Sequence, residues 1–365
     1  MHVPDGFINA PVSAATAAVA AAAVAVSLRG ARRELDDKAA PLAGLVAAFV
    51  FAVQMLNFPV AAGTSGHLLG GALAAILVGP YTGVLCISVV LLMQGVLFAD
   101  GGLTALGVNI TDMGIVTTVV AYGVFRVLVR LLPRGRTGLT AASFAAALVS
   151  VPAAAAAFTL IYALGGTTDV PVGQVFTAMV GVHVLIGLGE AVITALTVSA
   201  VAAVRPDLVH GARGLMKPLE LRTAAGPLPG SPAAPEGAAA AGSTGHGTPG
   251  APRSTKRLWT AGVAAALVCA GGLSYYASTS PDGLEKVAHD KGIDSKEEAH
   301  AAKDSPLADY QVKDVADERL SGGLAGVIGV GATLAAGTGV FVVLRRRRAR
   351  TAPAGSGSEP ESAAL

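Results

Sequence analysis

Cysteine and charge are both scarce in this chain. Its 365 residues include two cysteines, Cys86 and Cys269, which both lie inside apolar runs. A disulfide framework or a thiolate metal site needs several suitably spaced cysteines, so neither is expected. Only 14% of the residues are charged, whereas a soluble domain has roughly a quarter. With 53% hydrophobic residues and a mean hydropathy of +0.61, an ordinary soluble domain is excluded.

Two enzyme motifs are also missing. The sequence contains no Gly-x-x-x-x-Gly-Lys-Ser/Thr phosphate loop, so ATP hydrolysis by this chain is not expected. It contains no His-Glu-x-x-His, which argues against an intramembrane zinc protease. We therefore expect a protein that is not an enzyme, has no prosthetic cofactor and binds no nucleic acid. An intramembrane enzyme using His183 and Glu190 is a weaker hypothesis, because it lacks a recognisable nucleophile.

Several apolar runs approach the roughly 20 residues that a membrane-spanning helix needs. They predict an all-α, polytopic transmembrane bundle of about seven helices, followed by a C-terminal module of two membrane helices. The expected spans are residues 8–28, 41–60, 68–97 (two helices joined by a tight turn at Gly79-Pro80), 106–132, 141–164, 175–204, 258–277 and 322–344.

Composition divides the chain into four parts. Residues 1–215 form the first membrane domain, and residues 216–256 read as a disordered, cytoplasmic Pro/Gly/Ala-rich linker. Residues 257–350 form the two-helix module, whose charged loop has eleven acidic and six basic residues, a net charge of −5. Residues 351–365 read as a disordered tail.

The basic residues predict the orientation, because Lys and Arg favour the cytoplasmic side of short loops. With the N-terminus outside, the basic clusters at residues 29–38, 126–136, 205–217, 253–257 and 345–350 all fall inside. The connections at residues 59–67, 99–105 and 165–173 carry no Lys or Arg and fall outside. We expect a multi-pass cell-membrane protein with an external N-terminus, an external acidic loop and a cytoplasmic C-terminus.

The N-terminal residues Met1-His2-Val3-Pro4-Asp5-Gly6-Phe7 carry the most specific chemical pattern. A bulky second residue predicts that Met1 is retained, and the segment lacks the basic start of a signal peptide. The α-amine of Met1, the backbone nitrogen of His2 and the His2 imidazole can then form fused chelate rings around one cation. Three nitrogens in a plane suit Ni(II) or Cu(II).

The fourth ligand of such a site should be another imidazole. The best candidate is His67, which follows a Gly-Thr-Ser-Gly turn in an outer connection, on the same face as the N-terminus. Affinity should fall in acid, because the amine and the imidazoles must lose protons to bind a metal.

Three ionisable residues lie within the spans, where they are costly and therefore candidates for function. His183 and Glu190 are seven residues apart and share one helix face, which either supports the metal cavity or only locks helix packing. Asp112 lies near the external end of its helix, where it could cap or orient the outer loops. Asp5 either accepts a hydrogen bond from the N-terminal amide or His2, or only forms a Pro-Asp-Gly turn.

Three segments together resemble the CbiM/NikM-type substrate-binding (S) component of energy-coupling-factor (ECF) cobalt/nickel transporters. They are the Met1–Phe7 segment, the block from Asn57-Phe58-Pro59-Val60 through Gly63-Thr64-Ser65-Gly66-His67 to Gly71, and Gly101-Gly102-Leu103-Thr104-Ala105-Leu106-Gly107-x-Asn109. The resemblance covers about residues 1–215. It implies metal ligation by Met1, His2 and His67, and it makes Asn109 a cavity candidate beside His183 and Glu190. Asp112 departs from the asparagine usual in that family, so no ligand role is carried to it.

The second module resembles the small PDGLE-type membrane component found beside, or fused to, such S components, because Pro281-Asp282-Gly283-Leu284-Glu285 follows its first span. Together the resemblances imply capture of Ni(II) or Co(II) outside the cell, for ATP-driven import by partner chains. Those partners would be a transmembrane coupling (T) protein and cytoplasmic ABC ATPases. A metal-sensing or scaffold membrane protein without translocation is the alternative. A planar nitrogen set favours nickel, but cobalt systems of the family share the same N-terminal sequence, so the metal stays open.

Overall fold

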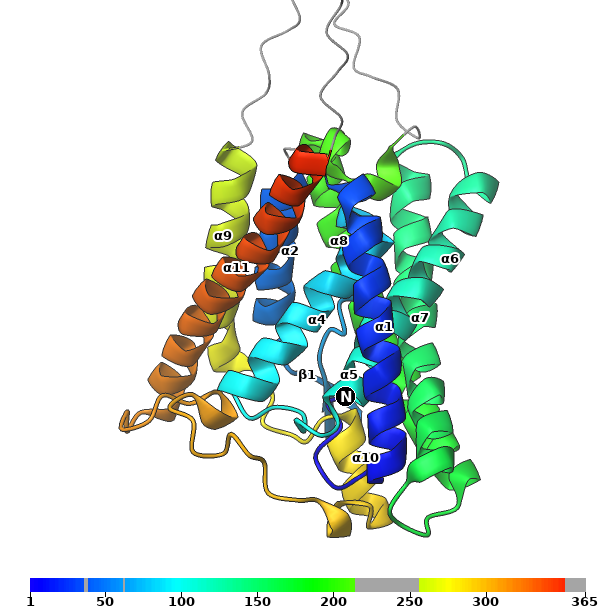
Figure 1. The fold of residues 1–365 in the computed structure, drawn as a ribbon, viewed down its shortest axis with the longest axis vertical. Helices are drawn as coiled ribbons and strands as arrows, with labels where there is room; N and C mark the ends of the chain where they lie inside the picture. The colour runs from blue at the N-terminus through cyan, green and yellow to red at the C-terminus, as the bar shows by residue number, and fades with distance from the viewer. Residues whose placement is uncertain (36–38, 62, 214–255, 352–365) are drawn as a thin grey trace, which may run out of the picture.

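The computed structural model describes residues 1–35, 39–61, 63–213 and 256–351 (Figure 1). The predicted linker and tail lie outside these residues, apart from Lys256 and Thr351, which belong to helices. The elements are α1 (Ala10–Glu34), α2 (Ala39–Gln54), β1 (Phe58–Ala61), β2 (Thr64–Gly66), α3 (Gly71–Val78), α4 (Pro80–Leu97), α5 (Leu106–Asn109), the π-helical turn η1 (Ile110–Val116), α6 (Thr117–Leu131), α7 (Arg136–Gly165), α8 (Val172–Val204), η2 (Pro206–Leu208), η3 (His210–Ala212), α9 (Lys256–Gly271), η4 (Leu273–Tyr276), α10 (Gly283–Lys291), η5 (Asp294–Lys296), η6 (Ala308–Tyr310) and α11 (Glu318–Thr351).

Among the described residues, seven helices are long and apolar enough to cross a membrane. Five belong to the first module and two, α9 and α11, to the second. The remaining helices predicted for the first module are also present, as the 16-residue α2 and the eight-residue α3. The prediction of a polytopic helical bundle with a two-helix module is therefore confirmed.

Local sequence explains where several helices begin and end. The Asn9 side chain accepts a hydrogen bond from the backbone nitrogen of Val12 and caps α1, whose first turn contains Pro11. Gly70 (φ +88°) and Gly79 (φ +101°) bound α3 on either side, in backbone conformations that favour glycine. The tight turn expected at Gly79-Pro80 is therefore confirmed, with a short helix before it.

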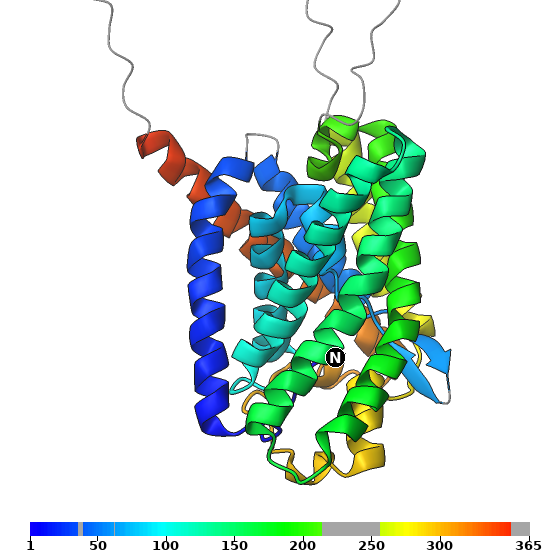
Figure 2. The same cartoon turned by 90° about the vertical axis from the view of Figure 1, so that its right-hand side faces the viewer.

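The span expected over residues 41–60 is too long. Helix α2 ends at Gln54, and the chain then forms a short antiparallel hairpin in which Phe58 pairs with Gly66. Gly63 in its turn has φ +75°. This hairpin was not predicted, because its strands have only four and three residues. It lies beside α8, where a Cβ on Gly189 would collide with the ring of Phe58 (Figure 2).

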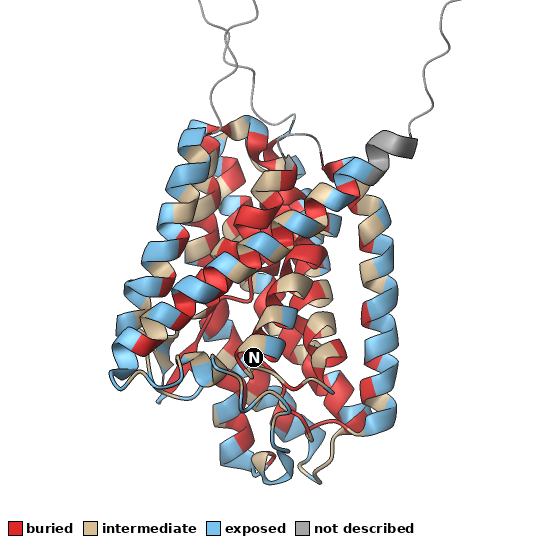
Figure 3. Ribbon diagram, turned by 60° about the vertical axis from the view of Figure 1, so that its left-hand side comes forward, coloured by how far each residue is buried: buried red, intermediate tan, exposed pale blue. Residues whose placement is uncertain are grey.

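Burial differs between the two faces of the long helices, as expected for a bundle surrounded by lipid (Figure 3). On α8, Leu188 and Leu196 are 51% and 66% exposed, whereas His183 and Glu190 are fully buried. These exposed positions are apolar, whereas the two ionisable side chains face the interior of the bundle.

The second module packs on the first through α2. Helices α9 and α11 both contact α2 (Figure 1). The contact with α11 is close, because a Cβ on Gly44 would collide with Thr338 and one on Gly329 would collide with Phe51. Small residues at these crossings let the backbones approach, as is common between helices in membranes.

The two ends of the bundle differ in chemistry. The helix ends that carry the arginine clusters lie at one end of the bundle (Figure 1). They are the C-terminal ends of α1, α6, α8 and α11 and the start of α9. The N-terminal segment and α10 lie toward the other end, and α10 packs on α8. The structure thus collects the basic helix ends on one side and the candidate ligands on the other.

Candidate metal centre

Most of the first seven residues are buried within the protein. Met1, Val3 and Phe7 are 2%, 0% and 1% exposed. The Val3 nitrogen donates to Asn109 Oδ1 at 2.7 Å, and the Val3 carbonyl accepts from Asn109 Nδ2 at 3.2 Å. The same carbonyl accepts from the backbone nitrogen of Gly102 at 2.9 Å. Asn109 therefore pairs with the N-terminal backbone much as a neighbouring strand would.

Asp5 and Gly101 complete this attachment. Asp5 Oδ1 accepts from the Thr104 nitrogen at 2.8 Å and from its hydroxyl, so Asp5 holds the segment that follows α4 and is not bonded to His2. Gly101 has φ +76°, and a Cβ there would lie 2.8 Å from Asn109 Nδ2 and 3.2 Å from His2 Cβ. Only glycine fits this close approach to the N-terminus.

His67 stands at the end of the hairpin, and its loop is fixed by Glu190. The Glu190 carboxylate accepts from the backbone nitrogens of Leu69, at 2.6 Å, and Gly70, at 3.2 Å. The Leu69 carbonyl accepts from Gln54 Nε2 at 3.0 Å. Glu190 of α8 therefore contacts the segment that follows His67 through its backbone, and these donors satisfy the buried carboxylate.

The Met1 amine and His67 Nε2 are 2.8 Å apart. His67 Nδ1 lies 3.0 Å from the Leu68 carbonyl, which can only accept, so Nδ1 carries the proton. In the neutral ring, Nε2 therefore keeps its lone pair, and it faces the N-terminus. This is the tautomer that a metal-ligating imidazole needs.

His2 is held in a complementary way. Its Nε2 lies 3.1 Å from Gln94 Oε1, and its Nδ1 lies 3.3 Å from Asp100 Oδ1. Nδ1 is the atom that closes a chelate ring with the residue's own backbone nitrogen. Burial lowers the pKa of His2 to about 4, and the Asp100 carboxylate only partly opposes that shift. The ring is thus neutral at pH 7, and it stacks on His67 with centroids 5.2 Å apart.

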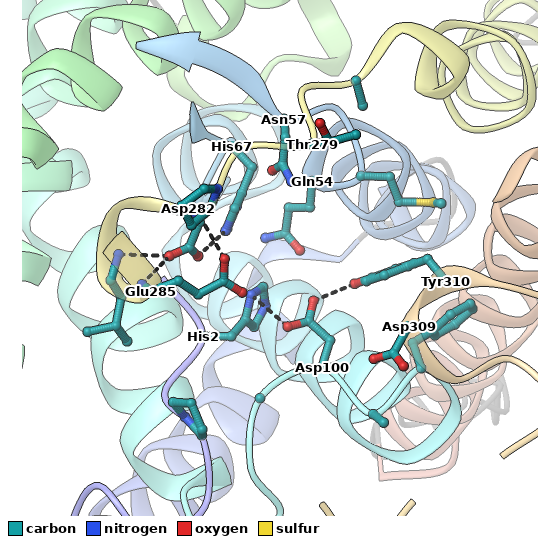
Figure 4. A pocket seen from close by; sticks show the side chains of 18 of the residues that line it. His2, Gln54, Asn57, His67, Asp100, Thr279, Asp282, Glu285, Asp309 and Tyr310 are labelled. Carbon is teal, nitrogen blue, oxygen red and sulfur yellow. Dashed lines mark hydrogen bonds and ion pairs between the residues drawn. The ribbon is translucent and has the colours of Figure 1, made fainter. Parts of the chain in front are cut away.

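Asp282 of the second module completes the cluster (Figure 4). Its Oδ2 lies 2.6 Å from the Met1 ammonium and 3.6 Å from His67 Nε2. Ligand atoms of His2, His67 and Asp282 all lie within 4.8 Å of one another. Burial would raise the pKa of Asp282, but the Met1 ammonium and His67 outweigh burial and hold that pKa well below its usual range.

The sequence after Asp282 explains its position. Asp282 caps α10 by accepting from the backbone nitrogens of Leu284 and Glu285, while the Glu285 side chain accepts from the Asp282 nitrogen. This reciprocal pattern is a capping box, and it fixes the start of the helix. One carboxylate oxygen of Asp282 is used in the cap, which leaves the other to face Met1.

A second carboxylate, Asp100, lies on the other side of His2 (Figure 4). Its Oδ1 is 3.3 Å from His2 Nδ1, and its Oδ2 accepts from the Tyr310 hydroxyl at 2.6 Å. Burial, followed by the charge of Asp100, raises the pKa of Tyr310, so the phenol stays a donor. Tyr310 stacks on Phe98, which connects the loop of the second module to the end of α4.

These groups line a cavity of about 980 Å³ between the two modules. The first module contributes His2, His67 and Asp100, and the second contributes Asp282, Glu285 and Tyr310. The donor set therefore combines neutral nitrogens with carboxylates, which suits a divalent transition metal.

The other ionisable residues of the spans lie in different surroundings. His183 borders a smaller cavity that also contacts Met1, His67 and Asp282. Asp112 lies in the π-helical turn η1, and neither of its carboxylate oxygens has a hydrogen-bond partner among the described residues. It lines neither of these cavities and does not cap the outer loops.

The structure thus places Met1, His2 and His67 together, with Asn109, His183 and Glu190 around them. Sequence analysis did not identify Asp282, Asp100, Gln94 or Tyr310 as parts of this site. The Asp282-x-x-Glu285 capping pattern was visible as a helix start, but nothing local indicated what its carboxylate would contact.

Comparison with protein families now bears on this arrangement. Residues 2–208, more than half of the chain, match the model of the cobalt uptake substrate-specific transmembrane region, CbiM. The chain belongs to the CbiM family. Residues 256–346 match the PDGLE domain. Both resemblances inferred from the sequence are therefore confirmed.

Members of the CbiM family with related sequences are named as transport proteins. A candidate metal transport protein of Haloquadratum walsbyi is 39% identical over 209 residues, covering 57% of this chain and 93% of that protein. A candidate fused nickel transport protein of Archaeoglobus fulgidus is 40% identical over 215 residues, covering 58% of this chain and 68% of that protein. The cobalt transport protein CbiM of Sorangium cellulosum is 37% identical over 216 residues, covering 57% and 94%.

Proposed function

We propose that this chain is the substrate-specific membrane component of an ECF-type transporter that captures Ni(II) or Co(II). The ligands would be the Met1 amine, the His2 backbone nitrogen, His2 Nδ1 and His67 Nε2. The observation that carries this proposal is the separation of 2.8 Å between the Met1 amine and His67 Nε2 in a buried site. Two adjacent ligands, each about 2.0–2.1 Å from a metal and at right angles, lie about 2.9 Å apart.

Charge supports the same assignment. Because Asp282 already holds a cationic ammonium, and His67 Nε2 carries a lone pair that faces it, the cavity suits positive charge. Metal entry would require the ammonium and the His2 amide to release their protons, and Asp282 is the acceptor nearest to the ammonium.

The family and the charge pattern support our proposal for the orientation and the partners. The arginine-bearing helix ends would face the cytoplasm, with the N-terminus outside and the C-terminus inside. A transmembrane coupling protein and cytoplasmic ABC ATPases would drive import, because the chain has no phosphate-binding loop of its own. Nickel is favoured over cobalt, since Ni(II) adopts planar nitrogen coordination with a deprotonated amide more readily.

The decisive experiment compares two variants of the full-length protein in detergent, using calorimetric titration with NiCl₂ and CoCl₂. His2→Gln removes one imidazole, and the bulky second residue keeps Met1 in place. Inserting Gln-Leu between Met1 and His2 keeps every side chain but moves the amine away from the imidazole. Both changes should weaken metal binding more than about 100-fold. Mutations of residues that only hold the ligands in place typically weaken metal binding 10–100-fold.

Uptake measurements in cells that also express the partner chains separate transport from sensing. Metal accumulation that needs both His2 and the ATPases supports a transporter. Tight binding without any accumulation would favour the sensor or scaffold alternative. Unchanged binding in both variants would refute the terminal chelate.

A further inference from the structure

The imidazole of His2 faces a hydrogen-bond acceptor at each of its two ring nitrogens. Nε2 lies 3.1 Å from Gln94 Oε1, and Nδ1 lies 3.3 Å from the Asp100 carboxylate (Figure 4). A neutral imidazole carries a single N–H, so it can donate to one of these acceptors and not to both. Gln94 and Asp100 therefore favour opposite tautomers of the same ring.

One of these tautomers suits the proposed chelate. Nδ1 is the nitrogen that would close a chelate ring with the backbone nitrogen of His2, so it must be without a proton. The proton of the ring then lies on Nε2, where Gln94 Oε1 accepts it. Histidines that bind a metal generally donate their other ring N–H to a fixed acceptor, which sets the tautomer and the ring orientation. Gln94 lies where such an acceptor is needed.

The position of Gln94 is fixed by the end of α4. Gln94 lies in the last turn of that helix and is fully buried. Burying an amide costs free energy unless the amide is hydrogen-bonded, and Gln94 Oε1 is bonded to His2. The backbone carbonyl of Gln94 accepts from the nitrogens of Phe98, at 3.0 Å, and Asp100, at 3.2 Å. Gln94 therefore provides one acceptor itself and positions the segment that carries the other.

Asp100 is the competing acceptor. Its Oδ2 accepts from the Tyr310 hydroxyl at 2.6 Å, and its Oδ1 lies beside His2. A proton on His2 Nδ1 would be donated to Asp100 and would block that nitrogen for a cation. The geometry favours Gln94, because its contact with His2 is a hydrogen bond, whereas Asp100 approaches the ring at ion-pair distance.

We propose that Gln94 is a positioning residue of the metal site, which accepts the Nε2 proton of His2 in competition with Asp100 and so leaves Nδ1 free for the cation. This proposal rests on the proposed function, because it assigns the residue that prepares one of the proposed ligands. Without Gln94, His2 would donate from Nδ1 to Asp100. A metal would then have to reverse that tautomer before it could bind.

The test measures the tautomer of His2 and the nickel affinity separately, in full-length protein in detergent. Nitrogen NMR of metal-free protein with isotope-labelled histidine distinguishes a protonated from an unprotonated ring nitrogen, and His2→Gln identifies the His2 signals. Calorimetric titration with NiCl₂ gives the affinity. Gln94→Met removes the acceptor at similar side-chain length, whereas Gln94→Glu retains an acceptor. Ser88→Ala, which removes a hydroxyl bonded to the Val84 carbonyl of the same helix, is the matched control.

We expect the ring proton on His2 Nε2 in the wild type and in Ser88→Ala. Gln94→Met should move the proton to Nδ1 and weaken nickel binding about 10–100-fold, the range typical of residues that hold a ligand in place. Gln94→Glu should restore both the tautomer and the affinity. In protein that also carries Asp100→Ala, the loss of affinity on Gln94→Met should be smaller, because the competing acceptor is gone.

A proton on His2 Nδ1 in the metal-free wild type would overturn the proposal, even if the Gln94 variants did not fold. An equal loss of affinity on Gln94→Met with and without Asp100→Ala would also overturn it, because a residue that only packs would act in that way. Failure of the proposed function would appear instead as nickel binding that is unchanged in His2→Gln. The tautomer measurement needs no metal, so the two failures can be distinguished.

Discussion

The two modules contribute to the candidate site in different ways. The first module fixes its proposed ligands through buried side chains that bind backbone groups, as Asn109 does for Val3 and Glu190 does for Leu69 and Gly70. The second module contributes the side chains of Asp282 and Tyr310, from a short helix and a loop at the end of the bundle. The first module thus supplies the proposed nitrogen ligands and the Asp100 carboxylate, and the second module adds the Asp282 carboxylate and the Tyr310 hydroxyl.

This difference suggests a division of labour. Ligands held by buried backbone contacts keep their geometry, which is what discrimination between metals requires. Ligands on a separately packed segment can move without disturbing the bundle. Affinity should therefore depend mainly on the first module, and the rate of binding on the second.

The largest effect is expected from His67→Leu, which removes a proposed ligand of the first module. Nickel affinity should fall more than about 100-fold, beyond the range for outer-sphere changes, as measured by calorimetric titration. His210→Gln is the matched control, because His210 lies beyond the C-terminal end of α8 and contacts Tyr122. Equal affinities in the two variants would show that the site is not at His67.

A smaller effect is expected from Glu190→Ala, which leaves every ligand in place but removes the acceptor for two buried backbone nitrogens. Nickel affinity should fall about 10–100-fold, because Glu190 positions the His67 loop. The free energy of unfolding should fall by about 2–3 kcal/mol, since buried donors without an acceptor are destabilising. Glu190→Gln keeps one acceptor and should lie between. A nickel affinity equal to that of the wild type in Glu190→Ala would mean that the loop carrying His67 keeps its conformation without Glu190.

Asp282→Asn tests the second module and should change equilibrium affinity less than about tenfold, below the 10–100-fold range typical of changes around the ligands. Nickel association, followed by stopped-flow absorbance, should become faster because the ion pair with the Met1 ammonium no longer has to break. A large loss of affinity would contradict the division of labour, since it would make Asp282 essential to the resting site.

The smallest effect is expected when the pH is lowered, on the free energy of unfolding of the metal-free protein. His2 of the first module and Asp282 of the second should respond to this change over different pH intervals. The pKa of His2 is about 4 in the folded protein and about 6.5 when unfolded. Between these values the unfolded chain binds more protons, so lowering the pH from 7 to 5 should reduce the free energy of unfolding. The metal-free protein should lose a few degrees of thermal midpoint, and His2→Gln should lose less.

Asp282→Asn should behave like the wild type over that same pH interval. The pKa of Asp282 is depressed, so its contribution to stability is lost only as the pH falls below its unfolded value of about 4. If the free energy of unfolding of Asp282→Asn depended less on pH than that of the wild type over this interval, the second module, and not His2, would be the part that responds to acid.

The sequence predicted the bundle well because its signals are local. Each signal is contained in a short stretch of sequence: the length of an apolar run, the Gly79-Pro80 turn, or a cluster of arginines. The helices that these signals predicted are present. Met1, His2 and His67 could be associated because the topology placed their loops at the same end of the bundle.

The parts that were missed depend on distant contacts. Asp282 is 281 residues from the amine it binds, and no pattern within the second module indicates that partner. Likewise, Tyr310 meets Asp100 only because α11 packs on α2 and carries the acidic loop across the end of α4. The hairpin at residues 58–66 escaped notice because strands this short have no recognisable periodicity.

The ion pair between the Met1 ammonium and Asp282 has one more consequence for a membrane. In the proposed chelate, a divalent ion would displace two protons, one from the ammonium and one from the His2 amide. Two positive charges would enter as two leave, so loading would be electroneutral. The membrane voltage would then neither help nor oppose capture, and the proton concentration outside would govern how readily the site fills.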